Sequence, residues 1–244
     1  MHKKYSIKEL LQNTAHRPWN VPQKRFSYYQ EWNRALFFHW KVDAEALQKY
    51  LPNNLELDLF EGSAWISLVA FTMEKIRPRL LPAVSLLSNF DEINLRTYVV
   101  KNGKQGVYFL NIEAGKKLSA DVARFLSGLP YEFSMMRRNN TNFYQAQFDK
   151  KGFRFKARYR VGKPLTEKSD LDVFLTERYC LYTNAKDQLF RYEIQHLPWE
   201  IHQLWVSELE TQYQIGTINL SRLPDKMHYS QGVQVVAWGK EEIS

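Results

Sequence analysis

Short turns between segments of alternating hydrophobicity constrain the fold of this chain most strongly. Asn102-Gly103 separates residues 92–100 from 106–113, and an Asn-Gly pair is typical of a two-residue hairpin turn. Two further pairs of segments surround the turn segments 149–152 and 184–187, namely 143–148 with 153–161 and 173–182 with 189–196. Segments joined by so few residues pair in the antiparallel sense. The sequence therefore predicts an antiparallel sheet built largely from hairpins.

Other strands are expected at 32–40, 55–60, 64–73, 201–209 and 231–238, and helices are few and short. We therefore predict an α+β fold, with a single antiparallel sheet curled toward a barrel and a few short helices. The 244 residues suit one domain over 1–244, with an N-terminal helix and connector in 1–31 and the core in 32–240.

One helix is marked unusually clearly at its end. Ser119 can cap its start, Gly128 can adopt the left-handed conformation just past its end, and Pro130 prevents its continuation. Tyr131 follows that proline directly. The helix stop is expected to fix the backbone of Tyr131, with its ring packed and its hydroxyl free to donate a hydrogen bond.

Composition excludes several classes of protein. The single cysteine, Cys180, rules out an intramolecular disulfide, and no apolar run reaches the roughly 18–20 residues of a membrane span. Near the start, Ser6 and Glu9 form a capping-box pattern that is unlike a signal peptide. We expect a cytoplasmic protein with no membrane partner. The sequence leaves homo-oligomerisation open.

The formal charge of +8 is concentrated most densely in one strand. Arg154, Lys156, Arg158 and Arg160 alternate with apolar residues, so the four cations share one face of a strand whose other face is buried. A solvated face explains this pattern, and a surface for an anionic partner is the alternative. No nucleic-acid-binding motif accompanies the charges, so nucleic acid is not expected as a partner.

Several common catalytic sites are absent from the sequence. It has no His-Glu-x-x-His, no paired Cys-x-x-Cys, no Gly-rich phosphate loop and no Gly-x-Ser-x-Gly elbow, and its six histidines show no ligand spacing. We expect no metal and no cofactor.

Polar residues at apolar positions are the remaining candidates for chemistry. Strict alternation along 32–40 would put Arg34 on the same face as Trp32 and Leu36, where an unpaired guanidinium would cost several kcal/mol. Along 92–100, Glu92 and Arg96 share a polar face that points either to water or to the interior of the sheet. Taken with Arg34, the interior is the favoured interpretation, and we predict that all three side chains point into one cavity.

A third polar group surrounds residues 173–182. Glu177 and Tyr179 alternate with Thr176 and Arg178, and either face could border a pocket. A surface ion pair beside an aromatic strand is the alternative. His196 is interpreted as a packing residue.

These same segments resemble the YqjF-like family of uncharacterised bacterial proteins, within the acetoacetate decarboxylase-like superfamily. The resemblance covers residues 32–238. It rests on Phe37-Phe38-His39-Trp40, Phe60-Glu61-Gly62-Ser63-Ala64-Trp65, Phe90-Asp91-Glu92-Ile93-Asn94-Leu95-Arg96-Thr97-Tyr98-Val99, Gly128-Leu129-Pro130-Tyr131, Glu177-Arg178-Tyr179-Cys180-Leu181-Tyr182 and His196-Leu197-Pro198-Trp199.

The more distant similarity to acetoacetate decarboxylase implies a barrel-like domain that encloses a cavity. Those enzymes have an arginine after an asparagine near the first strand, a glutamate on a mid-chain strand, and a helix with an arginine that leads to Pro-Lys. Arg34, Glu92 and Arg124 resemble the first three of these residues. Tyr131 stands where the lysine would form a Schiff base, and a phenol cannot form one.

We therefore expect a cavity that holds a small carboxylate or carbonyl compound, with no Schiff-base decarboxylation. Glu92 would act as acid or base and Tyr131 would donate a hydrogen bond to an oxygen of the ligand. The expected anion-binding residues are Arg34, Arg96, Arg124 and Arg178. Three interpretations stay open at this point: an enzyme of unknown reaction, a binding protein without turnover, and a structural network of buried ion pairs.

Overall fold

The computed structural model describes residues 4–185 and 188–243, except for the side chains of Leu86, Phe125 and Leu126. None of its described helices is long and apolar enough to cross a membrane. The elements run in the order α1 (Ile7–Gln12), β1 (Tyr28–Val42), α2 (Ala44–Gln48), β2 (Glu56–Leu57), β3 (Ala64–Pro78), α3 (Ser85–Ser88), β4 (Phe90–Lys101), β5 (Lys104–Ala114), α4 (Lys117–Ser127), β6 (Tyr131–Phe133), β7 (Met135–Arg138), β8 (Phe143–Phe148), the 3₁₀ turn η1 (Asp149–Lys151), β9 (Phe153–Pro164), α5 (Asp170–Thr176), β10 (Cys180–Ala185), β11 (Gln188–Gln195), β12 (Ile201–Gln212), β13 (Gln214–Ile215), β14 (Ile218–Asn219), β15 (Lys226–Ala237) and β16 (Glu241–Ile243).

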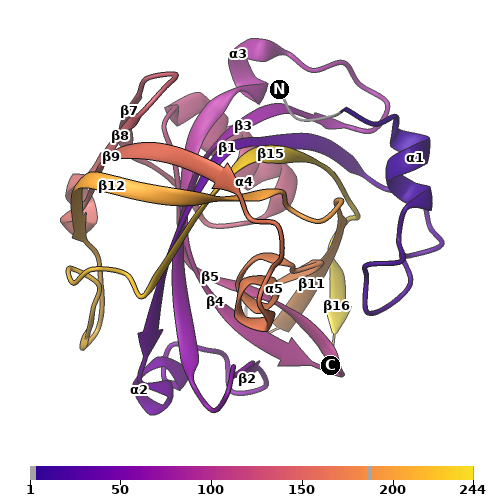
Figure 1. Ribbon diagram of the computed structural model, residues 1–244. Coiled ribbons are helices and arrows are strands. Elements are labelled where there is room, and N and C mark those ends of the chain that lie inside the picture. The colour runs from indigo at the N-terminus through magenta and orange to yellow at the C-terminus, as the bar shows by residue number, and fades with distance from the viewer. Residues whose placement is uncertain (1–3, 186–187, 244) are drawn as a thin grey trace.

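One 14-stranded sheet forms most of the molecule, in the order β16-β11-β10-β5-β4-β3-β1-β15-β12-β9-β8-β7, with β2 beside β4 and β6 beside β5. The long strands β1, β3 and β15 run through its middle (Figure 1). Strand β15 also pairs with β11 at two positions, so the sheet curls back on itself without closing into a true barrel. The predicted α+β fold, with one curled sheet and a few short helices, is confirmed, but the sheet is mixed, because β10 and β6 both lie parallel to β5.

The sheet has an inner and an outer apolar face. Ala35 and Phe37 of β1 belong to the inner cluster, which surrounds the cavity described below. Leu36, Phe38 and Trp40 belong to the cluster on the other face, where β8 and β9 pack. Alternation along β4 agrees with this division: Tyr98 is in the inner cluster and Leu95 in the outer one. The polar face of β4 therefore points to the interior, as predicted.

Strict alternation fails at Arg34, and this corrects its predicted position. Arg34 has a left-handed backbone (φ 54°), and the register of β1 against β3 shifts between Asn33 and Leu36. This bulge reverses the faces, so that Trp32 packs on the inner cluster while Leu36 lies in the outer one. Arg34 is therefore not among the residues that line the cavity. At the bulge, its guanidinium donates to Thr72 (2.8 Å) and to Asn140 (2.9 Å).

The helix signals were correct at α1 and at the end of α4. Ser6 and Glu9 form the expected capping box, Asp43 caps α2, and Gly128 is left-handed (φ 69°) after α4. Ser119, in contrast, lies inside α4 and does not cap it.

The predicted strand 173–182 is wrong in its first half. Residues Asp170–Thr176 form α5, because Ser169 and Asp172 make a second capping box. The strand of that hairpin, β10, begins only at Cys180. Two residues of the predicted turn, Lys186 and Asp187, lie outside the described residues.

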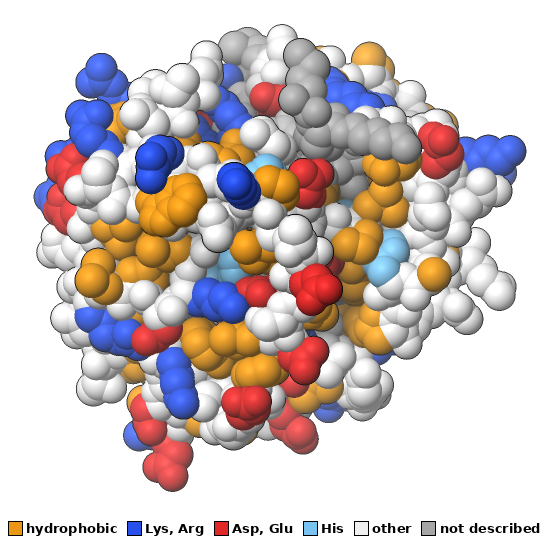
Figure 2. All heavy atoms as spheres, viewed as in Figure 1, with side chains coloured by type: hydrophobic (Ala, Val, Ile, Leu, Met, Phe, Trp, Pro, Cys, Tyr) orange, Lys and Arg blue, Asp and Glu red, His pale blue; other side chains and the backbone are white. Residues whose placement is uncertain are grey.

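The cationic strand matches its expected pattern. In β9, Phe153, Phe155 and Ala157 are buried while the intervening cations are more exposed. Glu208 of β12 forms ion pairs with Lys156 and Arg158, so part of the positive charge is neutralised. Figure 2 shows basic and acidic side chains interspersed on the face in view. This pattern agrees with a solvated face.

A chain of buried hydrogen bonds crosses four neighbouring strands on the inner face. His228 of β15 lies 3.1 Å from His39 of β1, His39 Nδ1 lies 2.6 Å from the Ser67 hydroxyl of β3, and Ser67 lies 2.5 Å from the Tyr98 hydroxyl of β4. Helix α5 holds both ends: Asp172 accepts from His228 (2.7 Å), and the carbonyl of Leu175 accepts from Tyr98 (2.8 Å). We call this chain the buried ladder.

The ladder makes folding stability depend on the charge of His39. Burial holds the pKa of His39 well below its usual 6.5, and the neighbouring His228, Arg96 and Lys226 lower it further. The unfolded chain therefore binds a proton at His39 that the native chain does not. The contribution of His39 to stability is complete above pH 6.5 and falls as the pH drops below it.

We predict that replacing His39 by glutamine reduces this acid sensitivity. Below pH 6.5 the free energy of unfolding of the wild-type protein should fall by up to about 1.4 kcal/mol per pH unit more than that of His39→Gln. Denaturant titrations of both proteins between pH 5 and 7.5 measure the difference, and other titrating groups cancel. Parallel pH profiles would contradict the assignment.

Candidate functional site

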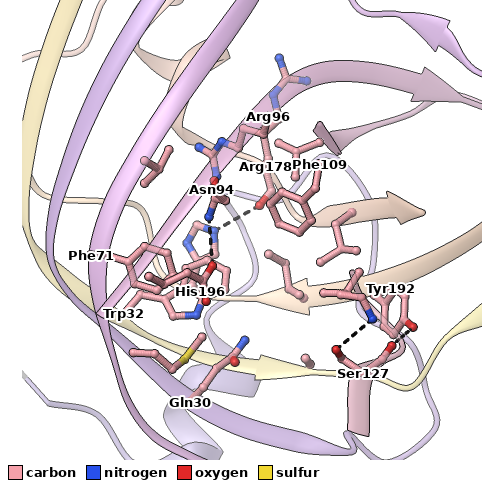
Figure 3. Close-up of a pocket in the computed structure, with 18 of the residues that line it drawn as sticks. Gln30, Trp32, Phe71, Asn94, Arg96, Phe109, Ser127, Arg178, Tyr192 and His196 are labelled. Carbon is pink, nitrogen blue, oxygen red and sulfur yellow. Dashed lines mark hydrogen bonds between the residues drawn. The ribbon is translucent and has the colours of Figure 1, made fainter. Parts of the chain in front are cut away.

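The inner face of the sheet encloses a cavity of about 100 Å³, several times the space that one water molecule needs. Figure 3 shows its side chains converging from several strands and from α4. Its walls are mostly apolar, and its polar groups come mainly from β4 and from the segment after α5. The lining residues are Tyr28, Gln30, Trp32, Val69, Phe71, Met73, Ile76, Glu92, Asn94, Arg96, Val107, Phe109, Ala123, Ser127, Leu129, Tyr131, Thr176, Arg178, Leu181, Tyr192, Ile194, His196, Trp199, Ala237 and Trp238.

Glu92 and Tyr131 form a hydrogen-bonded pair in the cavity wall. The Tyr131 hydroxyl donates to Glu92 Oε2 (3.0 Å), and the Asn94 amide donates to Oε1 (3.2 Å). Burial raises the pKa of Glu92 to about 7, although these hydrogen bonds and Arg96 oppose the rise. Burial, with the neighbouring Glu92, also keeps the pKa of Tyr131 well above its usual 10. Glu92 can therefore give or take a proton near neutral pH.

The end of α4 fixes the position of Tyr131. After the left-handed turn at Gly128, Tyr131 enters β6 and lies beside Ile112 of β5. The Arg124 guanidinium donates two hydrogen bonds to the Tyr131 carbonyl (3.0 and 2.5 Å). Arg124 itself is exposed and does not line the cavity. Arg124 therefore holds the backbone of Tyr131 in position, and it does not reach the cavity where it was predicted to bind an anion.

Arg96 is a buried cation without an anionic partner. Only 8% of the residue is exposed, and within the described chain no carboxylate oxygen lies within 4.0 Å of its guanidinium. Its guanidinium makes a long hydrogen bond of 3.5 Å to the Leu175 carbonyl and lies over the Phe37 ring, and its Nε has no partner among the described residues. Burial also lowers the pKa of Arg96, because removal from water disfavours the charged guanidinium. A buried guanidinium in this state is costly unless an anion joins it.

Two more polar atoms of the cavity wall lack a partner in the described structure. They are the indole nitrogen of Trp32, a donor, and the Asn94 side-chain oxygen, an acceptor. Native structures contain few such buried orphans, and a bound ligand is one way to satisfy them. Together with Arg96, they indicate where the polar part of a ligand would lie.

Arg178 lines the same cavity but is already paired. It forms an ion pair with Asp58 and donates to the Phe174 carbonyl (2.8 Å), and its guanidinium stacks on the Phe174 ring. His196 is hydrogen-bonded to the carbonyls of Arg178 (3.2 Å) and Leu197 (2.8 Å), and burial lowers its pKa. Because neutral His196 has one N–H, it donates to one of these two carbonyls, and its ring packs in the wall.

The structure thus brings together four of the predicted site residues: Glu92, Arg96, Tyr131 and Arg178. It places Arg34 and Arg124 elsewhere. Sequence reasoning placed Trp32 on the expected interior face but missed it as a polar contributor, because no local signal shows that its indole nitrogen lacks a partner. Asn94 could have been found from the sequence, because alternation along the strand puts it on the same face as Glu92 and Arg96. No lysine is among the described residues that line the cavity, and no group of metal-binding side chains occurs in the described chain.

A second buried carboxyl resembles Glu92 but lies outside the cavity. Glu113 accepts from Asn111 (2.7 Å) and from Tyr213 (3.1 Å), as Glu92 accepts from Asn94 and Tyr131. Burial raises the pKa of Glu113 to about 7 as well. Glu113 is therefore a matched internal control for experiments on Glu92.

The unpaired state of Arg96 leads to a test of stability. We predict that Arg96→Met leaves the free energy of unfolding unchanged or raises it, because the change removes a buried charge that pairs with nothing. Arg178→Met should lower it by about 3–5 kcal/mol, because Asp58 is left unpaired. Chemical denaturation of both variants measures this. Equal losses would instead indicate a structural network around Arg96.

Comparison with known proteins gives the family. A model of the DUF2071 family, described as an uncharacterized conserved protein, matches residues 29–234. The uncharacterized protein YqjF of Bacillus subtilis (strain 168) is 35% identical over 231 residues, which cover 90% of this chain and 93% of YqjF.

Solved structures share the fold at low identity. The enduracididine biosynthesis enzyme MppR complexed with pyruvate has a TM-score of 0.60 and 11% identity, covering 95% of each chain. An acetoacetate decarboxylase-like enzyme from Sphingomonas wittichii RW1 has a TM-score of 0.59 and 14% identity, covering 94% of this chain and 98% of that one. Acetoacetate decarboxylase from Legionella pneumophila has a TM-score of 0.58 and 14% identity, over 100% of this chain and 98% of its own. These likenesses establish an acetoacetate decarboxylase-like fold.

Proposed function

This chain belongs to the DUF2071 family of uncharacterised proteins, and from its cavity we propose that it binds a small organic acid carrying a carbonyl group. The observation that carries this proposal is Arg96. A guanidinium that is buried without an anionic partner is stabilised when a carboxylate enters and accepts two hydrogen bonds from it. Arg178 contributes less, because Asp58 already neutralises it.

Glu92 and Tyr131 are the proposed acid–base pair of this site. With a pKa of about 7, Glu92 can take a proton from the carbon next to a carbonyl group or return it. Tyr131 keeps its proton and can donate a hydrogen bond to a carbonyl or enolate oxygen. The proposed chemistry is therefore non-covalent proton transfer, and binding without turnover is the simpler outcome that the same cavity allows.

The ligand class has support from one similar structure. MppR was solved in complex with pyruvate, which carries both a carboxylate and an adjacent carbonyl. The same two groups would suit Arg96 on one side and the orphaned atoms of Trp32 and Asn94 on the other. A cytoplasmic location and the absence of nucleic-acid and cofactor partners stay predictions of the sequence.

We propose further that no Schiff base forms here, because Tyr131 stands where the decarboxylase lysine would be. Treatment with acetoacetate or pyruvate and sodium borohydride should therefore give no mass adduct on this protein. An acetoacetate decarboxylase treated in parallel is the positive control. A lysine adduct located by peptide mass analysis would contradict the prediction.

The charge of Glu92 should control affinity for an acid. Below pH 7 Glu92 is neutral, and above it the carboxylate would repel a bound anion, so affinity for pyruvate should fall by about tenfold between pH 6 and 8. Calorimetric titration measures this. Glu92→Gln should bind with little pH dependence, whereas Glu113→Gln should behave like the wild type. The same profile in all three proteins would remove Glu92 from the site.

A further inference from the structure

We propose that the acid bound in this cavity is a monocarboxylate with an apolar tail, held with its carboxylate on Arg96 and its tail toward the opposite end. This inference rests on the proposed function, since it concerns the same cavity, and it names the class of ligand. Three features of the wall support it: the number of free charges, the direction of the polarity gradient and the length of the cavity.

The charge count allows one carboxylate. Two cations line the cavity, and Arg178 is already neutralised by Asp58. Arg96 is the cation that lacks a carboxylate partner among the described residues. A second carboxylate on the ligand would have no free cation and would lie against apolar side chains, where an unpaired charge is very costly.

Polarity changes along the cavity. Arg96 and Arg178 lie at one end, and Gln30 and Ser127 lie at the opposite end in Figure 3. Gln30 and Ser127 at this second end are partly exposed, so the cavity borders solvent there, as it also does at Phe109 beside Arg96. Between the two ends, Phe71, Met73 and Leu129 supply apolar walls. Such walls offer a polyol or sugar acid almost no hydrogen bonds.

The cavity is also too long for a three-carbon acid. In the sheet Arg96 lies beside Ser67 of β3, and Met73, another lining residue, stands six residues further along the same strand (73 − 67 = 6). At roughly 3.3 Å per residue, these positions are much further apart than the two ends of pyruvate. A ligand that stayed near Arg96 would leave the apolar part of the cavity unfilled, whereas an apolar tail would remove that surface from water.

Calorimetric titration with straight-chain 2-oxo acids, from pyruvate to 2-oxooctanoate, tests the inference. Each added methylene should tighten binding about fourfold until the tail reaches the entrance. The dicarboxylate 2-oxoglutarate should bind more weakly than 2-oxopentanoate, which has the same chain length. Arg96→Met should weaken every member of the series by a similar factor, so that the dependence on length persists.

A matched pair of variants locates the tail. Met73→Asn should weaken binding of 2-oxooctanoate at least tenfold and leave pyruvate nearly unchanged. Met227→Asn replaces a partly buried methionine that packs on the outer cluster, away from the cavity, and should leave the whole series unchanged. Affinity that is flat or falls with chain length, while pyruvate still binds, would overturn the apolar tail and keep the proposed function. No binding by any acid would overturn both.

Discussion

The buried ladder is the interaction on which the site depends. It joins β15, β1, β3 and β4 through His228, His39, Ser67 and Tyr98, and it is held at both ends by α5. The Leu175 carbonyl of α5 accepts from both Tyr98 and Arg96, so the ladder also holds the carbonyl that Arg96 contacts. Buried polar groups specify one arrangement only when their partners are in place, so these hydrogen bonds set the register of the inner face.

The same low-dielectric interior produces the chemistry of the cavity. Glu92 and Glu113 show this clearly, because both are buried, both accept from an asparagine and a tyrosine, and both have a pKa raised to about 7. They differ in what they face. Glu113 lies against packed side chains, whereas Glu92 lines a cavity that also holds an unpaired arginine. A raised pKa alone therefore does not mark a site, and the neighbouring space and charge do.

The position of Tyr131 limits the chemistry that the cavity wall can offer there. The left-handed Gly128 and the two hydrogen bonds from Arg124 deliver residue 131 to the cavity wall. At that place an amine could form an imine, but a phenol can only donate or accept a hydrogen bond. The fold likeness to acetoacetate decarboxylases at 14% identity is thus compatible with a different use of the cavity.

Local sequence signals determined the hairpins, the caps of α1 and α2, the stop at Gly128 and the polar inner face of β4. These features follow from backbone preferences and from period-two alternation, which act over a few residues. Tertiary structure alone decided the bulge that moves Arg34 out of the cavity while Trp32 stays on the inner face, and the folding of residues 170–176 into a helix that holds both ends of the ladder. It also decided that Asp58 pairs with Arg178 while Arg96 stays unpaired. Those outcomes depend on which distant strands meet, and the energy of a buried charge depends on neighbours that the local sequence does not contain.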